Sequence, residues 1–230
     1  IAGRPKAMKS WLMYRLCFCV ENGIKFLGHY VEKGNALYLA LEDSKRRLKS
    51  RAYKMSCEKL ENFPTTDTEA PYLGYGLEQD LLKWINAVDK PKLIVIDTLA
   101  RVKPRQTFNK GTAYDLDNEL LRNLQHLAIE NNVTIAFVTH LSKAQQDYNF
   151  DKITGSVGLQ GMTDAMWLID RGDNSQTASI TGRGRDIMDF EYAVKWNDNT
   201  MTYDYVGNKV QIEINENTKM ILDAMKELKR

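Results

Sequence analysis

The chain has 230 residues, 43% of them hydrophobic and 27% charged, with 32 basic against 30 acidic side chains. This composition is typical of a globular protein that buries its own core, most simply as one domain, and the balanced charge gives no argument for or against nucleic acid binding. No apolar run approaches the length of a membrane span, no signal peptide opens the chain, and the three cysteines lack metal-ligand spacing, so we expect a cytoplasmic protein with buried, reduced thiols and no membrane partner.

The chain opens on Gly3–Ser10, GRPKAMKS, which has the length and ending of a phosphate-binding loop, G-x-x-x-x-G-K-[ST]. In such a loop backbone N–H groups surround the phosphates, the lysine neutralises them and the hydroxyl ligates Mg²⁺, roles that Lys9 and Ser10 can fill. Met8 replaces the last glycine, so the motif alone is equally compatible with an ordinary strand-to-helix turn. A methionine there meets φ values that disfavour side chains, and we expect the backbone to adjust. Because such a loop follows a strand, we expect the sequence to be a fragment that begins near the end of one.

Two helices and a strand are predicted next. Lys9–Glu21 is apolar nearly all round, which indicates a helix packed deep against a sheet, and Asn22-Gly23 ends it. Ala36–Leu41 is a continuous apolar run of strand length followed by Glu42, the profile of a central parallel strand buried on both faces. Lys45–Lys54 carries a basic run with apolar residues at helical spacing, which favours a helix with a solvated face.

The middle of the chain continues the alternation. A polar loop is predicted over Pro64–Pro71, and a helix over Leu77–Val88. Lys92–Thr98 is a second buried strand that carries Asp97 near its end. Arg101–Gly111 is interpreted as an exposed basic loop.

An amphipathic helix follows over Leu116–Ala128, and then a third strand, Val133–Thr139, which leads into His140. Ser142–Ser156 is polar and long enough to be a functional loop. Ala165–Ile169 is a fourth apolar run.

The last part of the chain has a different pattern. Thr177–Thr181, Phe190–Trp196 and Met201–Val206 are short β-type stretches separated by turn residues, which predicts antiparallel strands added to the sheet edge. A final helix is predicted over Glu216–Lys229. The whole pattern predicts an α/β fold with a mainly parallel central sheet, helices on both faces and antiparallel strands at the C-terminal edge.

In such sheets ligands bind outside the carboxyl ends of the strands. Lys9, Ser10, Glu42, Asp97 and His140 all fall at those ends, and each costs desolvation unless it has a partner. Their convergence predicts a nucleotide site. Asp97 would hold Mg²⁺ through water, Glu42 would orient and deprotonate the attacking water, and His140 would sense the γ-phosphate.

Each of these three residues also has a plainer interpretation. Asp97 is compatible with a carboxylate that simply ends a strand, and Glu42 with an acid placed beside a helix dipole. His140 is compatible with a structural histidine bonded to the backbone.

The successive blocks GRPKAMKSW, LYLALEDSKRRL, LIVIDTL, VTHLSK and ITGSVGL resemble those of RecA-like P-loop ATPases of the plasmid RepA replicative helicase type, an AAA-25-like family. The resemblance covers nearly the whole chain in the right order, and its most specific element is Leu39–Asp43 between the two Walker motifs. It implies a RecA-like three-layer sandwich, ATP and Mg²⁺ as cofactors, and a ring, usually a hexamer, with nucleotide at subunit interfaces and single-stranded DNA in the central channel.

The resemblance also implies roles for single residues. It assigns the catalytic glutamate to Glu42, the Walker B carboxylate to Asp97, the sensor to His140 and the arginine finger to Arg185, with Arg183 as a close rival. The implied nucleotide-binding residues are Gly3, Lys6, Ala7, Met8, Lys9, Ser10, Trp11 and, for stacking on adenine, Arg51 or Arg47.

The loops after Asp97 and His140 are similar in position to the DNA-binding loops of RecA-like proteins. The basic residues that they offer as phosphate contacts are Arg101, Lys103, Arg105, Lys110, Lys143 and Lys152, although each is also interpretable as an ordinary surface charge. The expected domain organisation is an ATPase domain over residues 1–214 and a C-terminal helix over residues 215–230.

The leading hypothesis is the motor domain of a helicase that replicates plasmid, phage or mobile-element DNA. The alternative is a nucleotide-sensing regulator or loader whose loop, degenerate at Met8, binds ATP and DNA without unwinding. A third hypothesis is a DNA-binding scaffold that is indifferent to nucleotide.

Overall fold

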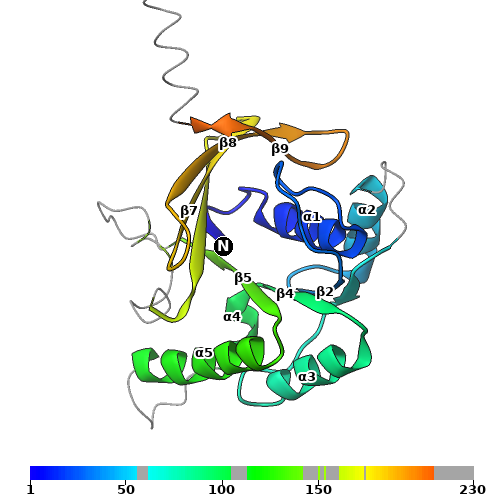
Figure 1. Cartoon of the computed structure of the whole chain (residues 1–230), viewed down its shortest axis with the longest axis vertical. Helices are drawn as coiled ribbons and strands as arrows, with labels where there is room; N and C mark the ends of the chain where they lie inside the picture. The colour runs from blue at the N-terminus through cyan, green and yellow to red at the C-terminus, as the bar shows by residue number, and fades with distance from the viewer. Residues whose placement is uncertain are drawn as a thin grey trace, which may run out of the picture.

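The computed structural model describes residues 1–55, 62–104, 113–141, 150, 153, 161–173 and 175–209. For residues 113–118 and 120 it describes the backbone only. Within these residues the strands form one sheet in the order β3-β2-β4-β5-β1-β6-β7-β8-β9 (Figure 1). The strands are β1 (Ala2–Gly3), β2 (Asn35–Ala40), β3 (Thr65–Asp67), β4 (Pro91–Asp97), β5 (Thr134–His140), β6 (Ala165–Arg171), β7 (Thr177–Gly184), β8 (Phe190–Asn197) and β9 (Thr202–Asn208).

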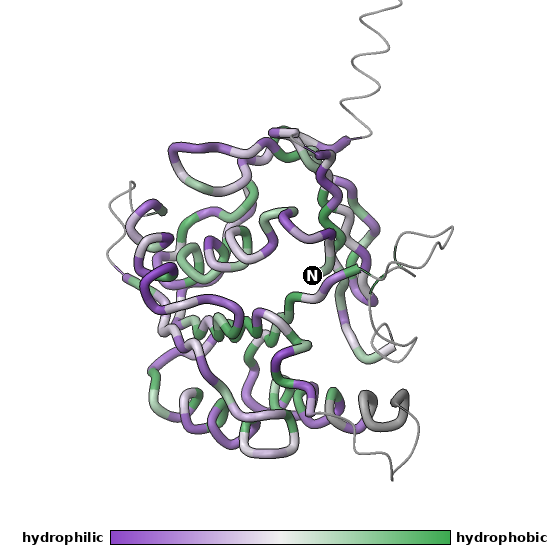
Figure 2. The backbone as a smooth tube through the Cα atoms, turned by 180° about the vertical axis from the view of Figure 1, so that it is seen from behind, coloured by the Kyte–Doolittle hydropathy of each residue, from purple (hydrophilic) through white to green (hydrophobic). Residues whose placement is uncertain are grey.

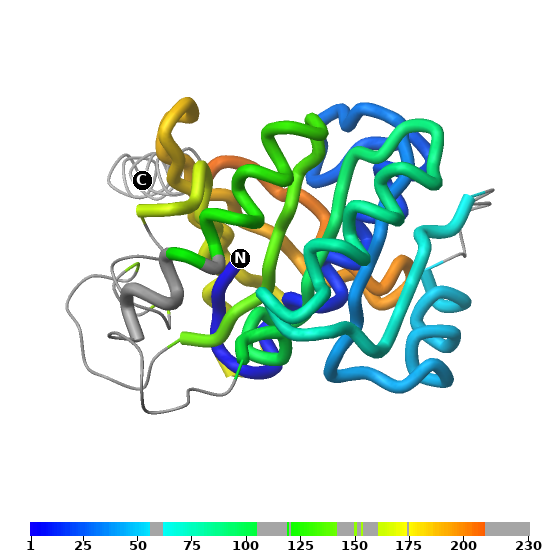
Figure 3. The backbone as a smooth tube through the Cα atoms, turned by 90° about the horizontal axis from the view of Figure 1, so that it is seen from below, coloured from blue at the N-terminus to red at the C-terminus, as the bar shows by residue number. Residues whose placement is uncertain are grey.

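Neighbouring strands from β3 to β6 pair in parallel, and β6, β7, β8 and β9 pair in antiparallel. The short strand β1 lies in the middle of the sheet, between β5 and β6, which Figure 3 shows from below. The predicted α/β class, with antiparallel strands added at the C-terminal edge of a mainly parallel sheet, is therefore confirmed.

The helices cover both faces of the sheet. They are α1 (Lys9–Asn22), α2 (Lys45–Met55), α3 (Leu77–Ala87), α4 (Leu99–Val102) and α5 (Ala113–Glu130). Figure 1 shows α1 and α2 on one side and α3, α4 and α5 on the other. This arrangement is the three-layer sandwich that the sequence predicts.

Alternation along β2 explains the two layers of core. Leu37 and Leu39 pack with α3 and α5, whereas Ala36, Tyr38 and Ala40 pack with α1 and α2, because successive side chains of a strand point to opposite faces. All five are nearly or fully buried. The continuous apolar run thus reflects a strand covered on both sides, and Figure 2 shows such apolar segments in the central strands.

The first helix is buried on most of its surface, as predicted. It ends at Gly23, whose φ of 64° is a left-handed conformation that glycine adopts at little cost. Cys17 and Cys19 on this helix are free and buried, as expected for reduced thiols; Cys57 lies outside the described residues. No helix among the described residues is both long and apolar enough to cross a membrane.

Two predictions about loops were wrong. Thr65–Asp67, predicted as part of a polar loop, is the edge strand β3, and its three residues are exposed, so no apolar pattern marks it in the sequence. The start of the predicted basic loop is the short helix α4, in which Leu99 and Val102 are buried three residues apart while Arg101 is exposed. The predicted helix over Glu216–Lys229 lies outside the described residues.

Strand β7 is longer than predicted because it includes Gly182, Arg183 and Gly184, which were interpreted as a separator between strands. A Cβ at Gly182 would lie 2.1 Å from the ring of Phe190 on the neighbouring strand. Here glycine makes room for an aromatic ring on the sheet face and does not mark a turn.

Candidate functional site

The predicted phosphate-binding loop leaves the sheet at the carboxyl end of β1. Gly3 is the last residue of that strand and pairs with His140 on β5 and Ile169 on β6. A Cβ at Gly3 would lie 2.8 Å from the carbonyl oxygen of Ile169, so the backbone of β6 leaves no room for a side chain. The glycine that opens the motif is therefore required by packing between neighbouring strands.

Lys9 lies inside the loop. Its side chain is only 6% exposed, and Nζ donates hydrogen bonds to the carbonyl oxygens of Gly3 and Arg4 at 2.8 and 2.9 Å. Burial lowers the pKa of Lys9 to about 8, and the carboxylates of Asp97 and Glu42 oppose this shift. A buried ammonium at a helix N-terminus is suited to an anion.

Met8 occupies the position of the missing glycine in the conformation that glycine would adopt. Its φ and ψ are 61° and 22°, a left-handed conformation, and Lys6 also has a positive φ of 64°. Met8 is the N-cap residue of α1, and that cap carries no side-chain hydrogen bond. Met8 therefore stays in a conformation that disfavours side chains, at a cost of about 1 kcal/mol of backbone strain, and the expected adjustment of the backbone is not seen.

Replacing Met8 by glycine is expected to change nucleotide affinity by less than about threefold. Glycine removes about 1 kcal/mol of strain but adds a similar entropy to the unfolded chain, and position 8 is already in the left-handed conformation that glycine favours. Titration of a fluorescent ATP analogue into both proteins measures the difference, with Asn132→Gly, another left-handed position (φ 51°), as the control. A gain of tenfold or more would support the regulator hypothesis, in which Met8 weakens binding.

Asp97 ends β4 beside the first turn of α1. Its side chain is 4% exposed, Oδ2 accepts a hydrogen bond of 2.5 Å from the Tyr38 hydroxyl, and the Ser10 side chain also hydrogen-bonds to the carboxylate. Burial raises the pKa of Asp97, and these two hydrogen bonds oppose the shift. The serine and the aspartate of the two motifs are thus in direct contact.

Glu42 lies two residues beyond the end of β2, next to the segment that follows β4. Its Oε1 accepts hydrogen bonds from Thr98 Oγ1 and from Arg101 Nε, both at 3.3 Å. The Glu42 side chain is 42% exposed, as a group that meets substrate and water requires. Arg101, predicted as a DNA contact, is therefore placed against the predicted catalytic glutamate.

Arg51 is buried against Trp11, just after the loop, whereas Arg47 is exposed. The Arg51 guanidinium is 5.1 Å from the centre of the Trp11 ring and pairs with Asp43. Its side chain is 11% exposed against 64% for Arg47, which also pairs with Asp43. Of the two arginines predicted to stack on adenine, Arg51 is the one held next to the residue that follows Ser10.

The two candidate arginine fingers lie at the other end of the sheet. Arg185 donates a hydrogen bond to the carbonyl oxygen of Gly161 at 2.6 Å and pairs with Asp164, just before β6 begins. Arg183 on β7 pairs with Asp189. Because β6 runs parallel to β1, its beginning is remote from the carboxyl edge, and neither arginine is brought to the loop of its own chain.

His140 is the last residue of β5 and is partly buried beside Gly3. Lys6 on the loop is exposed, and Lys103 after α4 is partly buried; their roles in nucleotide and DNA binding stay predictions. The predicted DNA contacts that lie outside the described residues are Arg105, Lys110, Lys143 and Lys152.

Sequence reasoning missed two members of this cluster, Tyr38 and Thr98. Tyr38 stood inside an apolar run and was counted as core, and Thr98 was counted as the last residue of a strand. No signal in the sequence marks either residue, because their contacts depend on β2 lying beside β4 in a register that pairs Ala40 with Asp97. Only the sheet order brings them together.

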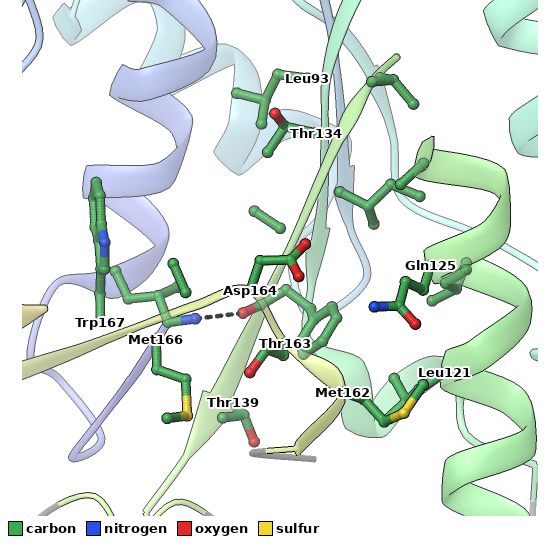
Figure 4. Close-up of a pocket in the computed structure, with 18 of the residues that line it drawn as sticks. Leu93, Leu121, Gln125, Thr134, Thr139, Met162, Thr163, Asp164, Met166 and Trp167 are labelled. Atoms are coloured by element: carbon green, nitrogen blue, oxygen red, sulfur yellow. Dashed lines mark hydrogen bonds between the residues drawn. The ribbon is translucent and has the colours of Figure 1, made fainter. Parts of the chain in front are cut away.

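A separate cavity of about 670 Å³ lies between β5 and β6, lined largely by apolar residues of α1, α5 and these strands. Figure 4 shows Leu121, Met162, Met166 and Trp167 among them, together with the polar residues Gln125, Thr134, Thr139, Thr163 and Asp164. None of the catalytic residues predicted at the strand ends lines it, so we place the candidate site at the carboxyl edge and not in this cavity.

The residues at that edge fit both predicted cofactors. Ser10 and Asp97 offer hydroxyl and carboxylate oxygens, the ligands that Mg²⁺ prefers, and Mg²⁺ commonly takes only one or two protein ligands besides substrate phosphates. Among the described residues, no group of three or more His, Cys, Asp or Glu could hold a metal by itself. Lys9 and the uncapped N-terminus of α1 supply positive charge for the phosphates.

Comparison with known proteins supports the fold. A solved structure described as an ATPase domain matches with a TM-score of 0.69 and 14% identity, over 90% of this chain and 83% of that one. A DnaB-like replicative helicase, solved in a study of its interactions with primase, matches with a TM-score of 0.67 and 13% identity, over 88% of this chain and 57% of that one. A search of curated protein sequences gives no match.

A family model also matches the sequence. The model for AAA_25, described as an AAA domain, covers residues 1–146. That stretch runs from the first strand to beyond β5 and includes the loop, Glu42, Asp97 and His140. The chain belongs to the AAA_25 family of AAA domains.

Proposed function

We propose that this chain is the ATP-hydrolysing motor domain of a RepA-like DNA helicase that replicates a plasmid, phage or mobile element as a hexameric ring. The observation that carries the proposal is the meeting of Lys9, Ser10, Glu42 and Asp97 at the carboxyl edge of one sheet. The ring and the replicon rest on the sequence resemblance, with support from the fold shared with an ATPase domain and a replicative helicase.

In this proposal the loop binds the phosphates of ATP. Lys9 exchanges its contacts with the carbonyl oxygens of Gly3 and Arg4 for phosphate oxygens, which relieves the desolvation of its charge. The first backbone N–H groups of α1 have no acceptor within the helix and point at the same place. Arg51, which lies against the ring of Trp11 just after the loop, is assigned to stack on adenine.

Glu42 is assigned to activate the attacking water. It is near the end of β2, partly exposed, and held by Thr98 and Arg101, so its carboxylate has a defined position from which to take a proton. Mg²⁺, when bound at Ser10 and Asp97, would neutralise charge on the phosphates. His140, paired with Gly3 at the start of the loop, is assigned to sense the γ-phosphate.

The remaining assignments concern neighbouring subunits and DNA. Arg185, or Arg183 in its place, would act as the finger in the site of an adjacent subunit, since both are remote from their own loop. The basic residues after α4 and β5 would contact single-stranded DNA. Residues 1–214 are proposed as the ATPase domain and 215–230 as a C-terminal helix.

The proposal predicts Mg²⁺-dependent ATP hydrolysis that single-stranded DNA stimulates. Steady-state assays with and without DNA measure it, and native mass spectrometry with and without ATP and Mg²⁺ shows whether a hexamer forms. Nucleotide binding by an assembled oligomer without hydrolysis would favour the regulator or loader. Absence of saturable ATP binding would favour the scaffold and contradict the proposal.

A further inference from the structure

Tyr38 links the two motifs of the candidate site. It lies near the middle of β2, with its side chain fully buried on the face of the sheet that α1 covers. Its hydroxyl donates to Asp97 Oδ2 at 2.5 Å and lies 3.2 Å from the carbonyl oxygen of Ser10. A tyrosine hydroxyl has one proton, so the shorter contact, to the carboxylate, is the stronger hydrogen bond.

Core packing alone does not explain a tyrosine at this position. The ring packs on Tyr14, with centroids 4.8 Å apart, and a phenylalanine ring would fill the same space. A buried hydroxyl is costly unless it has a partner. Here the partner is the single carboxylate that the neighbouring strand β4 delivers to the candidate metal site.

Three elements meet at this hydroxyl. Asp97 belongs to β4, Ser10 to the first turn of α1, and Tyr38 to β2, the strand that leads to Glu42 four residues later. A hydrogen bond to one carboxylate oxygen fixes the orientation of the whole group, because the carboxylate is planar. The distance between the Ser10 and Asp97 oxygens is then set before any ligand arrives.

We propose that Tyr38 is a positioning residue for the metal end of the nucleotide site: its hydroxyl orients Asp97 against Ser10 so that the pair receives Mg²⁺ together with ATP. This inference rests on the proposed function. The quantity that it concerns is the effect of Mg²⁺ on the affinity for nucleotide. Tyr38 itself contacts neither the metal nor the nucleotide in this proposal. Removal of the hydroxyl therefore weakens the contribution of Mg²⁺ and leaves metal-free binding of nucleotide intact.

The test measures binding of a fluorescent ATP analogue to the wild-type chain and to Tyr38→Phe, in EDTA and at a series of Mg²⁺ concentrations. We expect both proteins to bind equally, within about twofold, in EDTA, where Lys9 and the loop act alone. We expect the Mg²⁺ concentration for half-maximal effect to rise by about 10- to 100-fold in Tyr38→Phe, the range typical for lost partners of metal ligands. An unchanged Mg²⁺ dependence, or an equal loss in both conditions, would overturn the inference.

Three further variants make the outcome specific. Tyr14→Phe also removes a hydroxyl from the pair of rings, but Tyr14 is assigned no contact with Asp97. The Mg²⁺ dependence of its nucleotide binding should therefore equal that of the wild type. In an Asp97→Asn background, Tyr38→Phe should add nothing to the loss of Mg²⁺ dependence; an additional tenfold loss would contradict action through Asp97. If Tyr38→Phe does not fold, Tyr38→Met removes the same hydroxyl.

The wild-type chain itself tests the proposed function. If Mg²⁺ does not raise its affinity for the ATP analogue, the proposed function is refuted, and not the role of Tyr38 alone.

Discussion

Lys9→Ala is expected to lower the rate of ATP hydrolysis by about 100- to 1000-fold or more, the effect typical of a lost charge-stabilising donor in an active site. The ammonium is buried within the loop, between the carbonyl oxygens of Gly3 and Arg4, where an incoming phosphate replaces them. Alanine leaves the loop with no side-chain charge at that point. Steady-state hydrolysis and nucleotide titration of the same preparation separate the loss of turnover from the loss of binding.

The folded state should tolerate this change. Alanine removes two hydrogen bonds but also relieves the desolvation of a buried charge, so we expect the free energy of unfolding to change by about 1 kcal/mol or less. The matched control is Lys83→Ala, which removes an exposed lysine that pairs with Asp80 on α3. Hydrolysis by Lys9→Ala at the wild-type rate would show that the loop is not the phosphate site.

The fold was predictable from the sequence because its strands are covered on both faces. Ala36–Leu41 and Lys92–Thr98 carry continuous apolar runs, and such runs in alternation with helices leave few arrangements other than a parallel sheet. The edge strand β3 was not predictable in this way. Thr65–Asp67 is exposed at all three positions, so its pairing with β2 depends on backbone hydrogen bonds, which leave no side-chain pattern.

The polar members of the site were predictable from their positions at strand ends, but their contacts were not. That Ser10 bonds to Asp97, and that Arg101 contacts Glu42, depends on β2 lying beside β4 and on the short turn of α4. The sequence shows a methionine at the position of a glycine, but it does not show which backbone conformation that methionine adopts. With φ at 61°, Met8 adopts the left-handed conformation that glycine adopts at little cost, although it carries a side chain.

Glu42→Gln is expected to reduce hydrolysis by about 100- to 10,000-fold while nucleotide binding is kept, since general base catalysis contributes about that much. Glutamine has the shape of glutamate, and its amide oxygen can still accept hydrogen bonds from Thr98 and Arg101. It lacks the basicity to take a proton from water. Steady-state turnover and titration of a fluorescent ATP analogue, measured side by side, should therefore separate catalysis from binding.

The stability of the Glu42→Gln variant should stay close to that of the wild type, because the exposed ion pair between Glu42 and Arg101 contributes at most about 1 kcal/mol. Glu32→Gln is the matched control, since Glu32 is also an exposed glutamate paired with a basic residue, Lys92, but lies away from the loop. If Glu42→Gln hydrolyses ATP at half the wild-type rate or more, Glu42 is not the base. A loss of nucleotide binding equal to the loss of turnover would instead place Glu42 in phosphate binding, against its assigned role.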